Sequence, residues 1–176
     1  MCGESGSNSE PSGVQGICPA GWHLPSYNEW TSLERWVCEY IGNSNCDSEF
    51  SRELVSSGNF GQYTGDAHGE GSALAGACAL WSRRAWPQGA LFRRLTNSGS
   101  CDNDFGSSGL DFVPGGSYTY HAYYSSYSGR GVISSYWTTS PYGSSAYTRT
   151  LNISWTSVGR GTSLALNANS VRCIKD

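Results

Sequence analysis

The sequence predicts one α+β domain in which helices come first, antiparallel strands come last and disulfides staple the fold. Three observations support this: a helical pattern after Ser26, a Tyr-, Ser- and Thr-rich composition broken by glycine after residue 110, and seven cysteines in 176 residues. A chain of this length can bury one hydrophobic core. We expect residues 17–176 to form the domain and the small, polar residues 1–16 to form a leader or linker.

The clearest predicted helix begins after Ser26. Ser26 and Glu29 match the S-x-x-E capping box, in which hydroxyl and carboxylate satisfy free amide donors of the first turn. Apolar residues then recur every three or four positions and predict one apolar stripe that ends at Gly42: Trp30, Leu33, Trp36, Val37, Tyr40 and Ile41. Shorter helices are expected over Glu49–Ser56 and Ser72–Trp81.

The second half of the chain has the composition of strands and loops. Its clearest strand pattern is a period of two, with Tyr147, Arg149, Leu151, Ile153 and Trp155 on one face and Thr148, Thr150, Asn152, Ser154 and Thr156 on the other. Asn169–Lys175 is expected to be a closing central strand.

Charge and hydropathy exclude several classes of function. The net charge is -3, and the one basic cluster contains Arg83, Arg84, Arg93 and Arg94, so nucleic-acid binding is not predicted. No apolar run approaches the ~20 residues of a membrane-spanning helix, and none resembles a signal segment. The expectation is a mature form or a domain of a longer secreted protein, without direct membrane insertion.

The cysteines favour disulfides over zinc, because their spacings contain no C-x-x-C pair. They are Cys2, Cys18, Cys38, Cys46, Cys78, Cys101 and Cys173. Disulfides are typical of secreted proteins, so we expect an extracellular or cell-surface location. Seven is an odd number, and Cys2 is expected to be unpaired or to link two chains.

No catalytic residue and no cofactor are predicted. His23, His68 and His121 show no H-x-x-x-H spacing, and His23 is expected to be structural. The run Asp102-Asn103-Asp104 offers oxygen ligands that calcium uses. A polar turn is the preferred interpretation of that run, with structural calcium as the alternative.

The tyrosines carry the strongest functional signal. Five of them fall between residues 118 and 127, interleaved with Ser and Thr, and their spacing breaks strand periodicity. Aromatic faces beside hydroxyls suit sugars, and Tyr-rich surfaces also suit protein epitopes; a purely structural role is the alternative. The candidate ligand-binding residues are Tyr118, Tyr120, Tyr123, Tyr124, Tyr127, Tyr142, Thr148, Thr150, Asn152, Ser154, Trp155, Arg160 and Thr162.

Several blocks of sequence carry a family resemblance. They are PSGVQGIC (Pro11–Cys18), CPAGWHLPSYNEW (Cys18–Trp30), GLDFVPGGSY (Gly109–Tyr118), YWTTS (Tyr136–Ser140) and SVRCIKD (Ser170–Asp176). In this order they resemble the Fibrobacter succinogenes major paralogous domain, a family of bacterial secreted and surface domains. The L-P-x-x-x-E-W helix entry and the closing V-R strand are more distantly similar to the formylglycine-generating enzymes.

Both resemblances imply a C-type-lectin-like fold, with two main helices flanking irregular antiparallel sheets and the chain ends together. They imply a disulfide between Cys18 and Cys173. Cys46–Cys101 is the next expected pair, which leaves Cys38–Cys78. Residues 78–101 are longer and richer in arginine than the family pattern. The formylglycine-generating enzymes use reactive cysteines near the C-terminal end, where this chain has only Cys173, so no enzyme is predicted.

The expected function is therefore a secreted or surface-displayed adhesin- or lectin-like module that binds glycan or protein. A structural subunit of a surface fibre, with oligomers linked through Cys2, is the alternative, and an oxidase ranks third. Some C-type-lectin-like domains are varied by diversity-generating retroelements. The set Thr148, Thr150, Asn152, Ser154, Arg160 and Thr162 lies where such variable positions are expected.

Overall fold

The computed structural model describes residues 5–60, 70–76, 108–152 and 157–176. Three sheets are antiparallel: a four-stranded sheet of order β2-β7-β6-β5 and the two-stranded pairs β1-β8 and β3-β4. The domain is therefore α+β, as expected. Its elements are β1 (Trp22–His23), α1 (Tyr27–Tyr40), α2 (Cys46–Glu49), β2 (Gly58–Phe60), α3 (Glu70–Leu74), β3 (Ser117–Tyr120), β4 (Ser125–Ser128), β5 (Ile133–Tyr142), β6 (Ser145–Asn152), β7 (Val158–Leu164) and β8 (Ile174–Lys175).

The predicted capping box starts α1. The Ser26 hydroxyl accepts a hydrogen bond from the Glu29 amide at 3.1 Å, and the Glu29 carboxylate accepts one from the Ser26 amide at 2.8 Å. Trp30 and Val37 are buried as expected. Trp36 and Tyr40 were expected on the same stripe, but they are exposed and stack on each other with ring centroids 5.2 Å apart.

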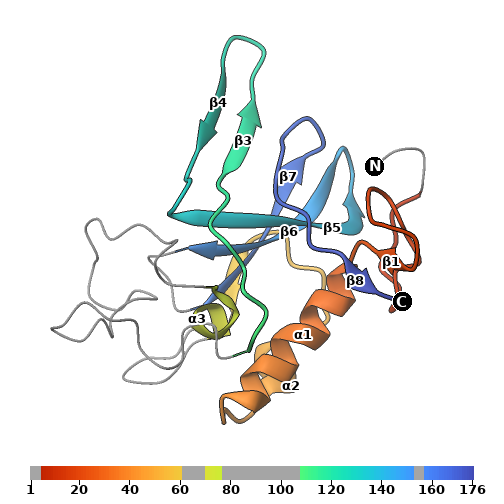
Figure 1. The fold of residues 1–176 in the computed structure, drawn as a ribbon, viewed down its shortest axis with the longest axis vertical. Coiled ribbons are helices and arrows are strands. Elements are labelled where there is room, and N and C mark those ends of the chain that lie inside the picture. Colours follow the sequence, from red (N-terminus) through yellow and green to blue (C-terminus); the bar gives the residue numbers. More distant parts are fainter. Residues whose placement is uncertain (1–4, 61–69, 77–107, 153–156) are drawn as a thin grey trace, which may run out of the picture.

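The core lies between α1 and the four-stranded sheet. Trp30 packs against Phe112 and Tyr136, with ring centroids 5.4 and 5.7 Å away, and Val158 and Leu151 of the sheet complete the cluster. Figure 1 shows α1 on one side of this sheet and the β3-β4 hairpin projecting on the other side. The hairpin is therefore free of the core.

The expected helix over Glu49–Ser56 is wrong, because α2 ends at Glu49. Side chains from other elements engage the carbonyls that a continuing helix would use. The Arg35 guanidinium donates to the Phe50 carbonyl at 2.8 Å, and Arg160 donates to the Ser51 carbonyl at 2.6 Å. Tertiary contacts thus replace the local helical bonds, and α1 is the one long helix of the described chain.

The helix expected over Ser72–Trp81 is present only in part. The helix α3 ends at Leu74, because Ala75 leaves it to form a parallel bridge with Phe112. Residues 77–81 lie outside the described residues, as do the basic cluster between Arg83 and Arg94 and the run Asp102–Asp104. No described helix is long and apolar enough to span a bilayer.

The alternation predicted for the late strand is confirmed over the described part, β6. Tyr147, Arg149 and Leu151 are buried on the face toward α1. The closing central strand over Asn169–Lys175 is a wrong prediction. Ser170 bridges Tyr136, and the chain then leaves β5 to form the two-residue β8 beside β1.

Packing of the domain begins before the expected boundary at Ile17. The Ser7 amide donates to the Thr139 carbonyl at 3.0 Å, and the Leu24 amide donates to the Val14 carbonyl at 2.8 Å. Ser12 and Val14 are buried. The polar segment from Ser7 onward is therefore part of the packed structure, whereas residues 1–4 lie outside the described residues.

Two disulfides are present among the described cysteines. Cys18–Cys173 joins the two ends of the chain as expected. The expected pairs Cys46–Cys101 and Cys38–Cys78 are wrong, because Cys38 pairs with Cys46. The chain reverses after α1 through Gly42 and Asn45, both at positive φ, and this turn brings the two Cα atoms within 5.8 Å. Cys2, Cys78 and Cys101 lie outside the described residues.

Candidate functional site

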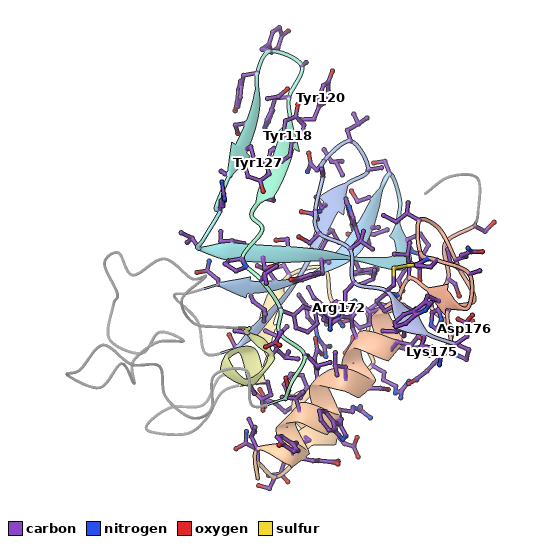
Figure 2. All side chains as sticks on the ribbon, in the orientation of Figure 1. Tyr118, Tyr120, Tyr127, Arg172, Lys175 and Asp176 are labelled. Carbon is purple, nitrogen blue, oxygen red and sulfur yellow. A yellow bond between two sulfur atoms is a disulfide. The ribbon has the colours of Figure 1, made fainter. Side chains whose placement is uncertain are left out.

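Residues 117–128 form a two-faced β-hairpin, here called the tyrosine hairpin. Tyr118 lies directly opposite Tyr127, and Tyr120 lies opposite Ser125. Opposed residues and alternate residues of a strand share one face, so these three tyrosines form an aromatic face. Figure 2 shows them along the projecting hairpin. The other face carries only hydroxyl side chains: Ser117, Thr119, Ser126 and Ser128.

The tip of the tyrosine hairpin places two further predicted residues in solvent. Tyr123 is 99% exposed and Tyr124 is 64% exposed. The Tyr124 ring stacks on His121 with centroids 4.5 Å apart, which orders one side of the tip. Tyr127 and Tyr120 are 62% and 45% exposed on the strands below. Five of the predicted tyrosines thus belong to one projecting element.

Backbone contacts fasten the base of the tyrosine hairpin to the rest of the domain. Tyr118 exchanges two backbone hydrogen bonds with Ala168, of 2.8 and 3.0 Å. The Tyr120 amide donates to the Asn167 side chain at 3.0 Å. The Tyr127 hydroxyl donates to the Gly115 carbonyl. These contacts hold the exposed rings on a defined support.

The neighbouring end of the main sheet exposes three further apolar side chains. Tyr142 pairs with Ser145, and Ser145 pairs with Leu164, so Tyr142 and Leu164 are at the same end of the sheet. Leu166 follows in the loop that contacts the hairpin, and all three side chains are exposed. Sequence reasoning found Tyr142 but missed the two leucines, because a single leucine in a strand pattern reads as core.

This half of the protein is almost free of exposed charge. Between Phe112 and Val171 the chain has no Asp and no Glu, and its basic residues there are Arg130, Arg149 and Arg160. Arg149 and Arg160 are buried. Arg130 is therefore the one exposed charged residue that the described part of this segment contributes, and it follows the hairpin at its base.

The predicted threonine face is less accessible than expected. Thr148 lies opposite Trp137 and is only 5% exposed, so its expected exposure is wrong. Thr150 and Asn152 are half-buried, and the Thr150 hydroxyl lies 3.1 Å from the Ser135 hydroxyl. Thr148 and Thr150 lie on β6 between β5 and β7, the two strands that flank it in the sheet. Ser154 and Trp155 lie outside the described residues.

Arg160 is a core residue and not an exposed one, which corrects the sequence prediction. Its guanidinium contacts the Glu34 carboxylate at 2.5 Å and the Tyr27 hydroxyl at 3.0 Å. Arg149 contacts the other oxygen of Glu34, also at 2.5 Å. Two arginines of the sheet thus share one buried carboxylate of α1. A buried guanidinium needs a buried counter-charge, and Glu34 supplies it, so Arg160 points inward.

A shallow depression of about 460 Å³ lies where β2 begins beside β7. Ser56 and Ser57 line one side of it. Three predicted residues, Thr150, Arg160 and Thr162, also contribute to the lining. Thr162 is half-buried. The depression brings three predicted residues together, but none of them belongs to the tyrosine hairpin.

His23 is a buried structural residue, as expected. Its Nε2 lies 2.7 Å from a Glu29 carboxylate oxygen, and its Nδ1 lies 2.5 Å from an Asp176 oxygen. The ring therefore links the start of α1 to residue 176. Among the described residues, no three His, Cys, Asp or Glu side chains lie close enough to hold a metal ion.

Comparison with known proteins gives one match. The family model described as the Fibrobacter succinogenes major domain matches residues 7–175, which is nearly the whole chain and includes the packed segment before Ile17. No curated protein and no solved structure matches significantly. The sequence blocks that suggested this family lie in the segment before β1, in β1, α1, β5 and β8, and at the base of the hairpin. The chain therefore belongs to the Fibrobacter succinogenes major domain family.

Proposed function

We propose that this domain is a secreted or cell-surface binding module of C-type-lectin-like fold. The tyrosine hairpin presents its aromatic face and tip to a glycan or protein ligand. The observation that carries the proposal is the exposure of Tyr120, Tyr123, Tyr124 and Tyr127 on one projecting element. Large exposed aromatic patches on soluble domains mark binding surfaces.

The described architecture supports the proposed fold and location. The chain ends meet through the β1-β8 pair and the Cys18–Cys173 disulfide, and the hairpin emerges from the late half of the chain. Two disulfides in one small domain are typical of an oxidising compartment. Each of these features agrees with a stapled scaffold that displays its C-terminal half.

The energetics favour binding over a structural role for these rings. A tyrosine buries about 150–250 Å² when it is covered, so four exposed rings leave a large apolar area unused in the free protein. Tyrosine also loses little conformational entropy on binding, because only two side-chain torsions become fixed. The hydrogen bond from the Tyr127 hydroxyl to the Gly115 carbonyl reduces that loss further for its ring.

The test compares the natural chain with the double variant Tyr123→Ser/Tyr124→Ser. Binding is measured on an array of glycans and on a panel of immobilised extracellular proteins. We expect ligands of the natural chain to be lost by the variant while its thermal unfolding is unchanged. The matched control is Tyr40→Ser, which removes an exposed ring of α1 on the far side of the sheet.

Equal binding by the natural chain and the hairpin variant would contradict the proposal. An assembly role is the alternative function. It would appear in light scattering as an oligomer of the natural chain that dissociates on reduction of the Cys2 link and persists in the hairpin variant, with no retained glycan or foreign protein.

A further inference from the structure

We infer that the tyrosine hairpin binds an uncharged carbohydrate, and that it does so without a metal ion and without ion pairs. This inference rests on the proposed binding function and names the class of its ligand. It follows from two properties of the hairpin that are independent of each other: what its exposed surface contains and what it lacks.

The hairpin surface contains the two kinds of group that a neutral sugar requires. A pyranose ring has C–H faces that pack on aromatic rings, and its hydroxyls need donors and acceptors at the sides. Tyr118, Tyr120 and Tyr127 supply the rings on one face. The hydroxyls of Tyr118, Tyr120 and Ser125, which lies opposite Tyr120 on the same face, can both donate and accept hydrogen bonds, and the Tyr127 hydroxyl, which donates to Gly115, can still accept.

The hairpin surface lacks carboxylates. Calcium in proteins takes six to eight oxygen ligands, and carboxylates supply much of the charge that holds it. The segment Phe112–Val171 has none, and no metal-binding cluster occurs among the described residues. A sugar at the hairpin is therefore held by protein groups directly, through stacking and hydrogen bonds between neutral partners.

The surface also lacks exposed cations at the tip. An acidic polysaccharide or an acidic protein would need Arg or Lys beside the aromatic rings. Arg130 follows the base of the hairpin, and Arg149 and Arg160 are turned into the core. Protein interfaces are typically enriched in Arg and use charge to orient their partners. A neutral carbohydrate is the ligand that needs no charged side chain beside the aromatic rings.

The experiment is a depletion assay on the whole chain with insoluble or immobilised polysaccharides. The neutral probes are cellulose, mannan, arabinoxylan and galactan, and polygalacturonate is the anionic comparison. Each is tested with and without EDTA, and in low salt and in about 1 M NaCl, where the Debye length is about 3 Å. We expect retention on at least one neutral polysaccharide, with no more than a twofold change on adding EDTA or salt.

Variants link that retention to the aromatic face and to the tip of the tyrosine hairpin. Tyr120→Ala and Tyr124→Ala should each weaken binding about tenfold, which corresponds to about 1.4 kcal/mol. Tyr124→Phe keeps the ring and should retain more binding than Tyr124→Ala. Tyr40→Ala removes a ring of similar exposure on α1 and should leave binding unchanged.

Three results would overturn the inference: no retention on any neutral probe, retention on polygalacturonate alone, or loss of retention in EDTA. If an immobilised protein is retained instead, and Tyr123→Ser/Tyr124→Ser abolishes that retention, the carbohydrate assignment fails while the proposed binding function stands. If no hairpin variant changes any retention, both fail together.

Discussion

Arg149 and Glu34 meet inside the protein, with the guanidinium Nε 2.5 Å from a carboxylate oxygen and both side chains fully buried. Arg149 belongs to β6 and Glu34 to α1, so the pair joins the helix to the centre of the sheet. Arg160 takes the second oxygen of the same carboxylate. One acidic residue of α1 therefore pairs with two arginines of the sheet that supports the tyrosine hairpin, in addition to the hydrophobic core between them.

Replacing Glu34 should destabilise the protein severely. The variant Glu34→Gln leaves two buried guanidiniums without their carboxylate, and breaking a buried ion pair costs about 3–5 kcal/mol. Urea unfolding measures the loss. The control is Asp47→Asn, which removes an exposed partner of Arg35 and should cost at most about 1 kcal/mol. Equal losses in the two variants would contradict the assigned role of Glu34.

His23 should make stability depend on pH from about 6.5 upward. Burial disfavours the charged ring, but hydrogen bonds and charge from Glu29 and Asp176 outweigh it and raise the pKa of His23 above 6.5. These carboxylates are the titratable groups that contact the ring. A neutral imidazole has one N–H and cannot donate to both.

Because the folded pKa of His23 is raised, its contribution is complete below the unfolded pKa near 6.5 and is lost as pH rises through the folded pKa. We expect the free energy of unfolding to fall over this window, and Asp176→Asn to reduce the fall. Titration of the His23 ring by NMR gives the pKa directly. A folded-state pKa at or below 6.5 would refute the prediction.

Glu70 should make the stability of the protein depend on pH in a lower range than His23 does. Burial raises the pKa of Glu70 from 4.5 to about 7, against the opposing hydrogen bond from Asn43. The folded state then holds a proton that the unfolded state releases, so stability falls as pH rises from 4.5 to about 7. This rise in pKa corresponds to about 3 kcal/mol. Glu70→Gln should remove the decline, as urea unfolding across this window would show; an unchanged decline would contradict this role.

The two disulfides should differ in their contribution to stability. The entropic model gives about 5 kcal/mol for the loop closed by Cys18–Cys173 and about 2.5 kcal/mol for the short loop of Cys38–Cys46. Unfolding of the double alanine variants measures both. Without reduction, tryptic cleavage after Arg35 and Arg52 should release one peptide that contains Cys38 and Cys46 and is lighter by two hydrogens. A Cys38–Cys78 peptide would show that the pairing is different.

Gly116 should control the position of the tyrosine hairpin. Its φ is +79°, and an added Cβ would lie 2.5 Å from the Ser128 carbonyl oxygen. Gly116→Ala must therefore shift the base of the hairpin. Gly143 also has a positive φ, but a Cβ added there would have no atom within 4 Å, so Gly143→Ala is the control. We expect faster hydrogen exchange of the hairpin and weaker ligand binding in Gly116→Ala only. Equal effects of the two variants would show that backbone strain alone, and not the contact with Ser128, is responsible.

Local signals in the sequence were sufficient for several features. The capping box at Ser26, the alternation along β6 and the change from helix to strand composition each depend on neighbouring residues, and the structure contains all three. The cluster of tyrosines between residues 118 and 127 also identified the element that projects from the domain. The hydrophobic pattern of α1 could not tell which of its aromatic residues meet the sheet, and Trp36 and Tyr40 do not.

By itself the sequence determined the fold class, the main helix, the disulfide that its family resemblance implied between the chain ends and the tyrosine-rich element. Only the tertiary structure decided that Arg160 turns inward to Glu34, that Cys38 pairs with Cys46, and that the polar segment after Ser7 belongs to the packed domain. The physical reason is the range of the interactions. Helix caps and strand periods act between near neighbours, whereas counter-charges, cysteine partners and the covering of a face depend on which distant segments the fold brings together.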